Sequence, residues 1–210
     1  MRVKVLGGSA VVKRSWSNGQ WYVNPAWADL KFTLDAADNS VSIVDRAGAL
    51  FARTGNGLYV FDKRFFIKST TTGYQWYDRQ GNTIDYDTAG RIRGYADKNG
   101  VKVSFEYDAA GNRSRLLDHN GQTVLSFTYS NGWLAAITDR TGRKVQYHYQ
   151  GEDLTEVVDV LGNSSRYTYD GNHQLLTLTD AEGRITTVTY ATTVPPPPGA
   201  NSRPPRLPTT

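Results

Sequence analysis

Aspartates at a regular spacing are the residues of this sequence whose type could do chemistry. They open six Asp-x-x-Gly motifs, at Asp78, Asp97, Asp118, Asp139, Asp159 and Asp180, which close at Gly81, Gly100, Gly121, Gly142, Gly162 and Gly183. Two carboxylates about 5 to 9.5 Å apart can hydrolyse a glycoside, but they must sit in unlike environments to act as acid and base. Because every aspartate fills the same slot of the same motif, we expect structural turns and no enzymatic activity.

Metal chemistry is the second alternative for these motifs. Asp and Asn cluster in DKNG, DHNG and DAADN, yet none of these stretches has the alternating oxygen ligands and final glutamate of a calcium loop. His119, His148 and His173 lack the spacing of zinc ligands. The chain has no cysteine, which removes disulfides and thiolate sites. We expect neither a metal nor a cofactor.

The net charge and the hydropathy of the chain limit the classes of partner that it could bind. The formal net charge is +4, and Arg203 and Arg206 supply two of these charges, so residues 1–190 carry only +2. That balance is too weak for a nucleic-acid footprint. No window approaches 18 uninterrupted apolar residues, so no membrane span is expected. Two glycines and a serine interrupt the N-terminal apolar run, and we predict no signal peptide in this chain, which is either cytoplasmic or an internal piece of a longer protein.

The elements that would position the aspartates are repeated. Successive Asp-x-x-Gly motifs start 19, 21, 21, 20 and 21 residues apart. A second series, led by Tyr86, Tyr107, Tyr129, Tyr149 and Tyr169, has spacings of 21, 22, 20 and 20 residues and interleaves with the first. Each unit of about 21 residues therefore contains two turns and two strands, as tandem hairpins require.

The strand segments place aromatic residues on one face. In QTVLSFTY the apolar and polar residues alternate, which is the period of a strand with one apolar face. The predicted aromatic ladder consists of Phe105, Tyr107, Phe127, Tyr129, Tyr147, Tyr149, Tyr167, Tyr169 and Tyr190. Cross-strand pairs of this kind contribute roughly 0.2 to 1 kcal/mol each. In the turns, aspartate accepts backbone N–H groups and glycine supplies a positive φ.

Three regions follow from composition. Residues 1–73 read as a β-rich leading or capping region without the period, residues 74–190 as the repeats, and residues 191–210 as a proline-rich linker or disordered tail. A proline-reading module is the alternative partner for that tail. The fold class predicted is all-β, with tandem hairpins forming an extended, curved antiparallel sheet.

The repeats resemble a known family. RYTYDGNHQLLTLTDAEGRITTVTY, residues 166–190, is similar to the RHS or YD repeat of large bacterial surface and secreted proteins, which is related to the repeats of teneurins. The resemblance covers about residues 74–190. It implies a sheet that winds into a hollow β-shell, which in bacterial members encloses a C-terminal toxin released after self-cleavage. This sequence departs from the pattern because it has few repeats and shows neither a self-cleaving segment nor a toxin domain.

The function predicted is that of a structural wall segment in a secreted or surface-displayed bacterial parent protein. Its partners would be further RHS repeats or the C-terminal toxin domain of that parent. The alternative is a carbohydrate-binding adhesion module with glycans as partners. Five tryptophans could stack on sugar rings or form the core of a thin sheet, namely Trp16, Trp21, Trp27, Trp76 and Trp133.

Overall fold

The computed structural model describes residues 1–5, 8–17 and 19–190. The predicted proline-rich tail therefore lies outside the described residues, as does Asn18 in the hairpin predicted around Gly19. The strands are β1 Arg2–Val5, β2 Gly8–Val11, β3 Ser15–Ser17, β4 Gln20–Tyr22, β5 Leu30–Leu34, β6 Val41–Arg46, β7 Ala49–Gly55, β8 Leu58–Phe61, β9 Phe65–Thr70, β10 Gly73–Asp78, β11 Thr83–Tyr86, β12 Ile92–Ala96, β13 Lys102–Tyr107, β14 Arg113–Leu117, β15 Thr123–Ser130, β16 Trp133–Asp139, β17 Lys144–Gln150, β18 Asp153–Val158, β19 Ser164–Tyr169, β20 Leu175–Thr179 and β21 Ile185–Thr187.

The one helical element among the described residues is the 3₁₀ turn η1, Pro25–Trp27. The prediction of an all-β chain built from tandem hairpins is confirmed.

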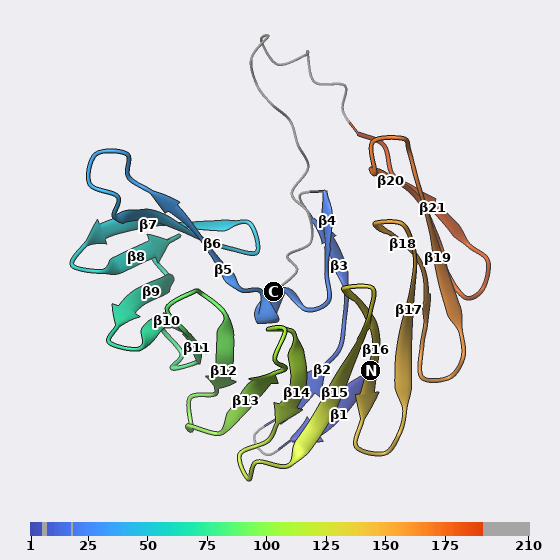
Figure 1. Cartoon of the computed structure of the whole chain (residues 1–210), viewed down its shortest axis with the longest axis horizontal. Coiled ribbons are helices and arrows are strands. Elements are labelled where there is room, and N and C mark those ends of the chain that lie inside the picture. The colour runs from blue at the N-terminus through green and yellow to red at the C-terminus, as the bar shows by residue number, and fades with distance from the viewer. Residues whose placement is uncertain (6–7, 18, 191–210) are drawn as a thin grey trace. The chain divides into compact units, whose positions relative to one another are not determined.

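The chain divides into two compact units, and the larger unit runs from Arg2 to Ser126. Within it, strands β5 to β14 pair antiparallel in chain order, each with the next (Figure 1). Two further hairpins, β1 with β2 and β3 with β4, precede them. Short connections and consecutive pairing make every strand pairing from β5 to β14 local in sequence.

The smaller unit begins at Phe127. Strands β16 to β21 form the same succession of antiparallel neighbours. The repeat pattern of the sequence thus becomes the same local structure in both units.

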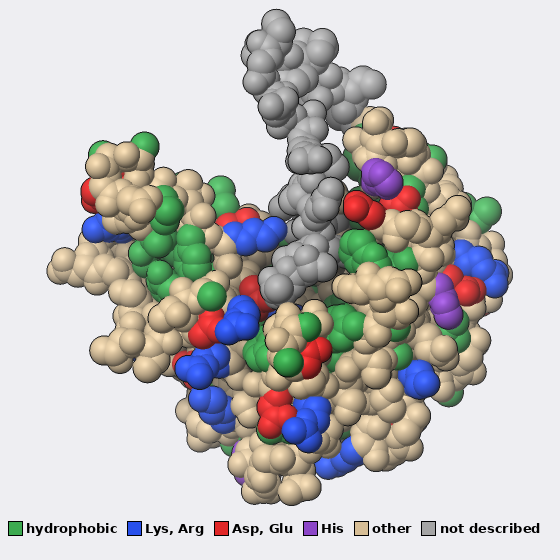
Figure 2. Space-filling view, in the orientation of Figure 1, with side chains coloured by type: hydrophobic (Ala, Val, Ile, Leu, Met, Phe, Trp, Pro, Cys, Tyr) green, Lys and Arg blue, Asp and Glu red, His purple; other side chains and the backbone are tan. Residues whose placement is uncertain are grey.

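Each sheet has a buried face and an open face, because side chains alternate along a strand. In the larger unit Val44, Phe51 and Ile67 lie on the buried face and are at most 1% exposed. In the smaller unit Ile137 and Val157 do the same, at 0% and 2%. Figure 2 shows hydrophobic side chains gathered over the strands around β7 to β9.

Candidate functional site

The predicted turn residues share one geometry. In each Asp-x-x-Gly motif the aspartate Oδ1 accepts the backbone N–H groups two and four residues ahead, at 2.8 to 3.0 Å. The closing glycines have φ between +75° and +89°. That left-handed conformation costs a residue with a Cβ about 1 kcal/mol or more. Each carboxylate therefore bonds within its own turn. We propose that the motif has a structural role, which substitutions of the aspartate or the glycine can test.

Hydrogen bonding also sets the acidity of these groups. Donation from the Asn163 side chain and from backbone N–H groups lowers the pKa of Asp159 from its ordinary value. Asp139 is the buried member of the series, at 5% exposure. Burial pushes its pKa up, but donors on Thr141 and Arg143 outweigh burial and lower the pKa to about 2.

The tyrosine-led turns follow the same rule with local departures. Asp87 and Asp108 repeat the aspartate geometry, at 2.8 to 3.0 Å. Where the aspartate is missing after Tyr129, Asn131 and Gly132 adopt φ of +51° and +80°, which suits a two-residue hairpin. Gly151, with φ +62°, serves the turn after Tyr149.

The repeat tyrosines contribute hydrogen bonds as well as ring contacts. The hydroxyl of Tyr169 donates to the carbonyl oxygen of Leu154 at 2.8 Å, and that of Tyr190 donates to Leu175 at 3.1 Å. Tyr107 donates to Ile92 in the same way, and each acceptor lies 15 residues before its tyrosine. Each hydroxyl therefore ties one hairpin to the hairpin before it.

A β-bulge precedes several of the repeat tyrosines. The strand register shifts immediately before Tyr86, Tyr107, Tyr149 and Tyr169. A bulge bends a strand and re-aims the side chain that follows. The sequence predicted a ladder of rings, and the structure adds a ladder of hydroxyl bonds.

The ring contacts of the ladder include residues outside the predicted set. Tyr149 stacks on Trp133 with centroids 5.4 Å apart, and Phe105 meets Tyr95 at 6.5 Å. Phe105 also meets Trp27 edge to face at 5.4 Å. Burial, with a smaller contribution from Tyr129, raises the pKa of Tyr149 to about 12, so its hydroxyl stays neutral near pH 7.

A short segment before the periodic part, residues 24–30, packs against the first repeats; we call it the N-terminal strap. Asn24 caps η1 by accepting the Ala26 N–H at 3.1 Å, and its amide donates to the Val11 carbonyl at 2.9 Å. Trp27 is 3% exposed. At the end of the strap Leu30 N–H donates to the Gly90 carbonyl at 2.8 Å. Gly90 has φ +84°, and a Cβ there would come within 2.8 Å of the Leu30 carbonyl oxygen.

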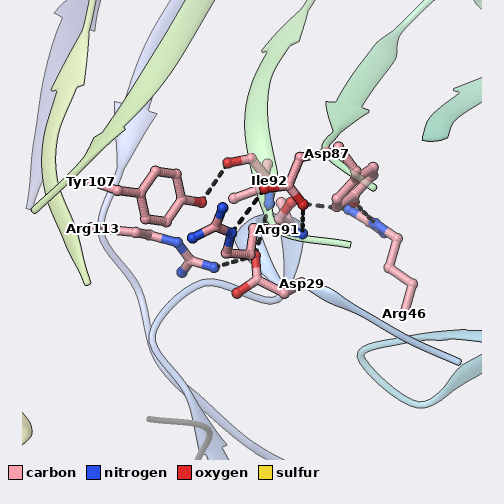
Figure 3. A network of polar contacts seen from close by, with 9 residues as sticks. Asp29, Arg46, Asp87, Arg91, Ile92, Tyr107 and Arg113 are labelled. Atoms are coloured by element: carbon pink, nitrogen blue, oxygen red, sulfur yellow. Dashed lines mark hydrogen bonds and ion pairs between the residues drawn. The ribbon is translucent and has the colours of Figure 1, made fainter. Parts of the chain in front are cut away.

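Asp29 of the strap is held by two separate parts of the repeats (Figure 3). Its Oδ1 accepts the Ile92 N–H at 2.8 Å and a guanidinium N–H of Arg113 at 2.7 Å. Both charged side chains are only 23% exposed. Burial acts to lower the pKa of Arg113, but Asp29 and Tyr107 outweigh it and the pKa is raised. A pair desolvated to this degree is costly to break on one side.

Arg46 of β6 makes the third polar link, from the leading strands to the strap. Its Nε donates to the Tyr86 hydroxyl at 2.8 Å and its Nη2 to the Ala26 carbonyl at 3.0 Å (Figure 3). The same guanidinium lies 5.0 Å from the ring centroid of Trp76. One side chain thereby joins the strap, β10 and β11.

Sequence reasoning missed this network, although one signal for it was present. In the strand pairings Tyr86 faces Ile92, Tyr149 faces Leu154 and Tyr169 faces Leu175, whereas Tyr107 faces Arg113. The aliphatic members are at most 4% exposed. An arginine where sister repeats bury an aliphatic residue indicates a buried acceptor from elsewhere in the chain.

Two remaining features concern the described part of the chain: groups of metal ligands and helices that could span a membrane. Residues 1–5, 8–17 and 19–190 contain no group of three or more His, Cys, Asp or Glu side chains placed to hold a metal ion. Within those same ranges, no helix is long and apolar enough to cross a membrane.

The fold defines the class of protein: a β-hairpin repeat protein with a strap across its first repeats. A family model described as RHS Repeat matches residues 86–123 and 150–185. These two segments match the RHS repeat that the sequence predicted.

A curated relative and several solved structures are similar to parts of the chain. Double-stranded DNA deaminase toxin A of Burkholderia cenocepacia (strain H111) is 29% identical over 132 residues, which are 59% of this chain and 9% of that protein. Crystal structures of TcdB2-TccC3-Cdc42 and of TcdB2-TccC3 without its hypervariable C-terminal region match with 19% identity and a TM-score of 0.38, over 73% of this chain and 9% of theirs. A TM-score this low carries no argument. The chain spans about a tenth of the length of these proteins.

Proposed function

We propose that this chain is a structural wall segment of a longer secreted or surface-displayed protein, in which further RHS repeats complete a shell around a C-terminal toxin. One observation carries the proposal: the hydroxyls of Tyr107, Tyr169 and Tyr190 each bond a hairpin to the one before it. This contact repeats without a defined end, so a sheet built on it grows by adding hairpins.

The similarity to a toxin supports the second half of the proposal. The relative is named a double-stranded DNA deaminase toxin, and this chain corresponds to 9% of it. No catalytic role follows for the repeats themselves, because their turn carboxylates are occupied by backbone N–H groups. The role assigned to this chain is to enclose and not to react.

Protease protection in the parent protein tests the proposal. Substituting Tyr169→Phe and Tyr107→Phe together should loosen the wall and expose the C-terminal region, so that region should be cleaved faster by trypsin. The matched control is Tyr77→Phe on the open face, which should leave the cleavage rate unchanged. Equal cleavage rates in all three proteins, with the double variant verified as destabilised, would contradict an enclosing role.

Sugar binding is the second hypothesis and has less support. Trp27 is 3% exposed, Trp76 is covered by Arg46 and Trp133 is stacked on Tyr149. A glycan array probed with the purified chain tests it, and binding that Trp76→Ala abolishes while the fold is retained would favour this hypothesis.

A further inference from the structure

The N-terminal strap lies against the first repeats without belonging to a sheet. Its residues from Asn24 to Asp29 form no strand, and Leu30 is the first residue of β5. The strands before it form two separate two-stranded sheets, β1 with β2 and β3 with β4. The strap therefore meets the repeats through side chains and single main-chain groups, as a bound peptide meets its receptor.

The repeats contact the tryptophan of the strap with two aromatic residues. Trp27 meets Phe105 edge to face at 5.4 Å, and Phe105 lies 6.5 Å from Tyr95 between ring centroids. Burial raises the pKa of Tyr95, and a hydrogen bond from the Trp27 side chain opposes that rise. Because an indole has a single N–H donor and no acceptor, that N–H is paired with the Tyr95 hydroxyl. Both the ring and the donor of Trp27 are thus recognised.

Two residues later, the repeats bind the carboxylate of the strap. Arg113 donates an Nη2–H to Asp29 Oδ1 at 2.7 Å, beside the Ile92 N–H at 2.8 Å (Figure 3). The guanidinium carbon of Arg113 lies 5.6 Å from the ring centroid of Phe105. Phe105 therefore adjoins both the tryptophan and the arginine that binds the aspartate. The spacing of these groups on the repeats matches the sequence Trp-x-Asp.

The recognising groups are held in place by the sheet and not by the strap. Tyr95 belongs to β12, Phe105 to β13 and Arg113 to β14, and these three strands pair with one another in succession. In that ladder Tyr95 pairs with Val103 and Phe105 with Leu116. A site built on paired strands keeps its geometry when its ligand leaves, which lowers the ordering cost of binding.

The strap does not use the full donor capacity of the site. The Nε of Arg113 is buried and has no hydrogen-bond partner among the described residues. Both bonds that Asp29 makes end on its Oδ1. A carboxylate that accepts from two guanidinium nitrogens makes two parallel bonds, and a buried donor left unpaired costs about 1 to 3 kcal/mol. A segment that is not tethered at Leu30 can place its carboxylate across both nitrogens.

We propose that Tyr95, Phe105 and Arg113, with the Ile92 N–H, form a recognition site for a Trp-x-Asp peptide segment, which the strap occupies as an exchangeable ligand. The partner that fits is a Trp-x-Asp segment of another polypeptide chain. The strap is then an autoinhibitory contact, because a ligand from outside binds only the fraction of molecules whose site is vacant. A chain with a weakened strap therefore binds such a segment more tightly than the native chain.

Peptide binding to the full chain tests the proposal. A fluorescein-labelled peptide of residues 22–31 should bind the Trp27→Ala chain at least tenfold more tightly than the native chain, as measured by fluorescence anisotropy. The same peptide carrying Asp29→Asn should bind at least tenfold more weakly. Adding Arg113→Leu to the Trp27→Ala chain should abolish binding, whereas the matched control Arg115→Gln on the open face should leave it unchanged. Absence of binding to a folded Trp27→Ala chain, or equal affinity of the two peptides, would overturn the proposal.

Amide hydrogen exchange in the native chain tests whether the strap leaves its site, and it decides the question if circular dichroism shows that Trp27→Ala does not fold. The Ile92 N–H bonds to Asp29, and the Leu30 N–H bonds to Gly90. Local opening of the strap exposes both groups while the sheet stays paired. Both should exchange at least tenfold faster than the ladder amides of β13. Exchange of all these amides at one rate would mean that the strap opens only with the sheet, which contradicts the proposal.

Discussion

The leading strands β5 to β9 and the repeat strands β10 to β21 are the same kind of antiparallel ladder, yet they are held together differently. In the repeats, an aspartate turn recurs in most units, and the hydroxyls of Tyr107, Tyr169 and Tyr190 bond to the preceding hairpin. In the leading strands the contacts are individual: Arg46 reaches Tyr86, and Phe51, Phe61 and Phe65 form their own aromatic cluster. The open face differs as well, because it is apolar in the first region and carries Glu and Arg pairs in the second.

The difference in contacts between the two regions indicates how the first repeats of the sheet are stabilised. A hairpin in the middle of the ladder can rely on a neighbour of its own kind, and the first hairpins cannot. The strap and the Asp29 to Arg113 pair add contacts to the first repeats that the periodic part does not supply. Stability should therefore depend on single residues near the strap and be spread over many equivalent residues in the repeats.

The largest effect is expected from Arg113→Leu, which installs the residue type of the sister repeats. Asp29 would keep the Ile92 N–H but lose its charged partner, and we expect a loss of about 3 kcal/mol in the free energy of unfolding. Urea denaturation followed by tryptophan fluorescence measures this. Adding Asp29→Asn should restore most of the loss, since no charge then remains buried.

The matched control for that cycle is Arg115→Gln, which removes an ion pair from the open face. The Arg115 and Glu106 side chains are 53% and 39% exposed, so the expected change is below about 1 kcal/mol. If both substitutions cost the same, the strap has no special role and the comparison between the regions fails.

An intermediate effect on the free energy of unfolding is expected when acid protonates Asp139. Its pKa is lowered to about 2 from its ordinary value of 3.8, so its stabilising contribution is complete above pH values near 4 and is lost as the pH falls toward 2. After allowance for screening by solvent, this amounts to about 1 to 2 kcal/mol.

Unfolding measured between pH 5 and about 2 should therefore show a shallower loss of stability in Asp139→Asn than in the native chain. The asparagine can still accept the turn N–H groups but does not titrate in this range. A native and a variant chain with parallel pH profiles would show that this turn does not differ from its exposed counterparts.

The smallest effect is expected from removing single tyrosine hydroxyls. Tyr169→Phe deletes the 2.8 Å bond to Leu154 and should cost about 1 kcal/mol in thermal or urea unfolding. Tyr59→Phe in the leading strands deletes a bond of 3.4 Å to Val41 and should cost less than half of that. A reversed order would mean that the hydroxyl ladder does not hold the repeats together.

The sequence by itself determined the features that repeat. Alternation along QTVLSFTY indicated one buried face, although Val124, expected on the other face, is as fully buried as Leu125. The spacing of the aspartates indicated the hairpins, and glycine at the fourth turn position marked the left-handed residue. These are local properties, set within a few residues by backbone sterics and hydrogen bonding. For that reason the all-β class and the RHS repeats could be predicted without a structure.

Only the tertiary structure decided which single residues depart from the repeat and why. Arg113 and Asp29 are 84 residues apart, and nothing in their spacing pairs them. The acceptor of each tyrosine hydroxyl depends on a bulge whose position follows from strand register. The alignment of Ile43, Ala52, Val60, Phe66 and Tyr77 on the open face likewise exists only once five strands are paired. Such contacts depend on how distant segments pack, which a local pattern does not specify.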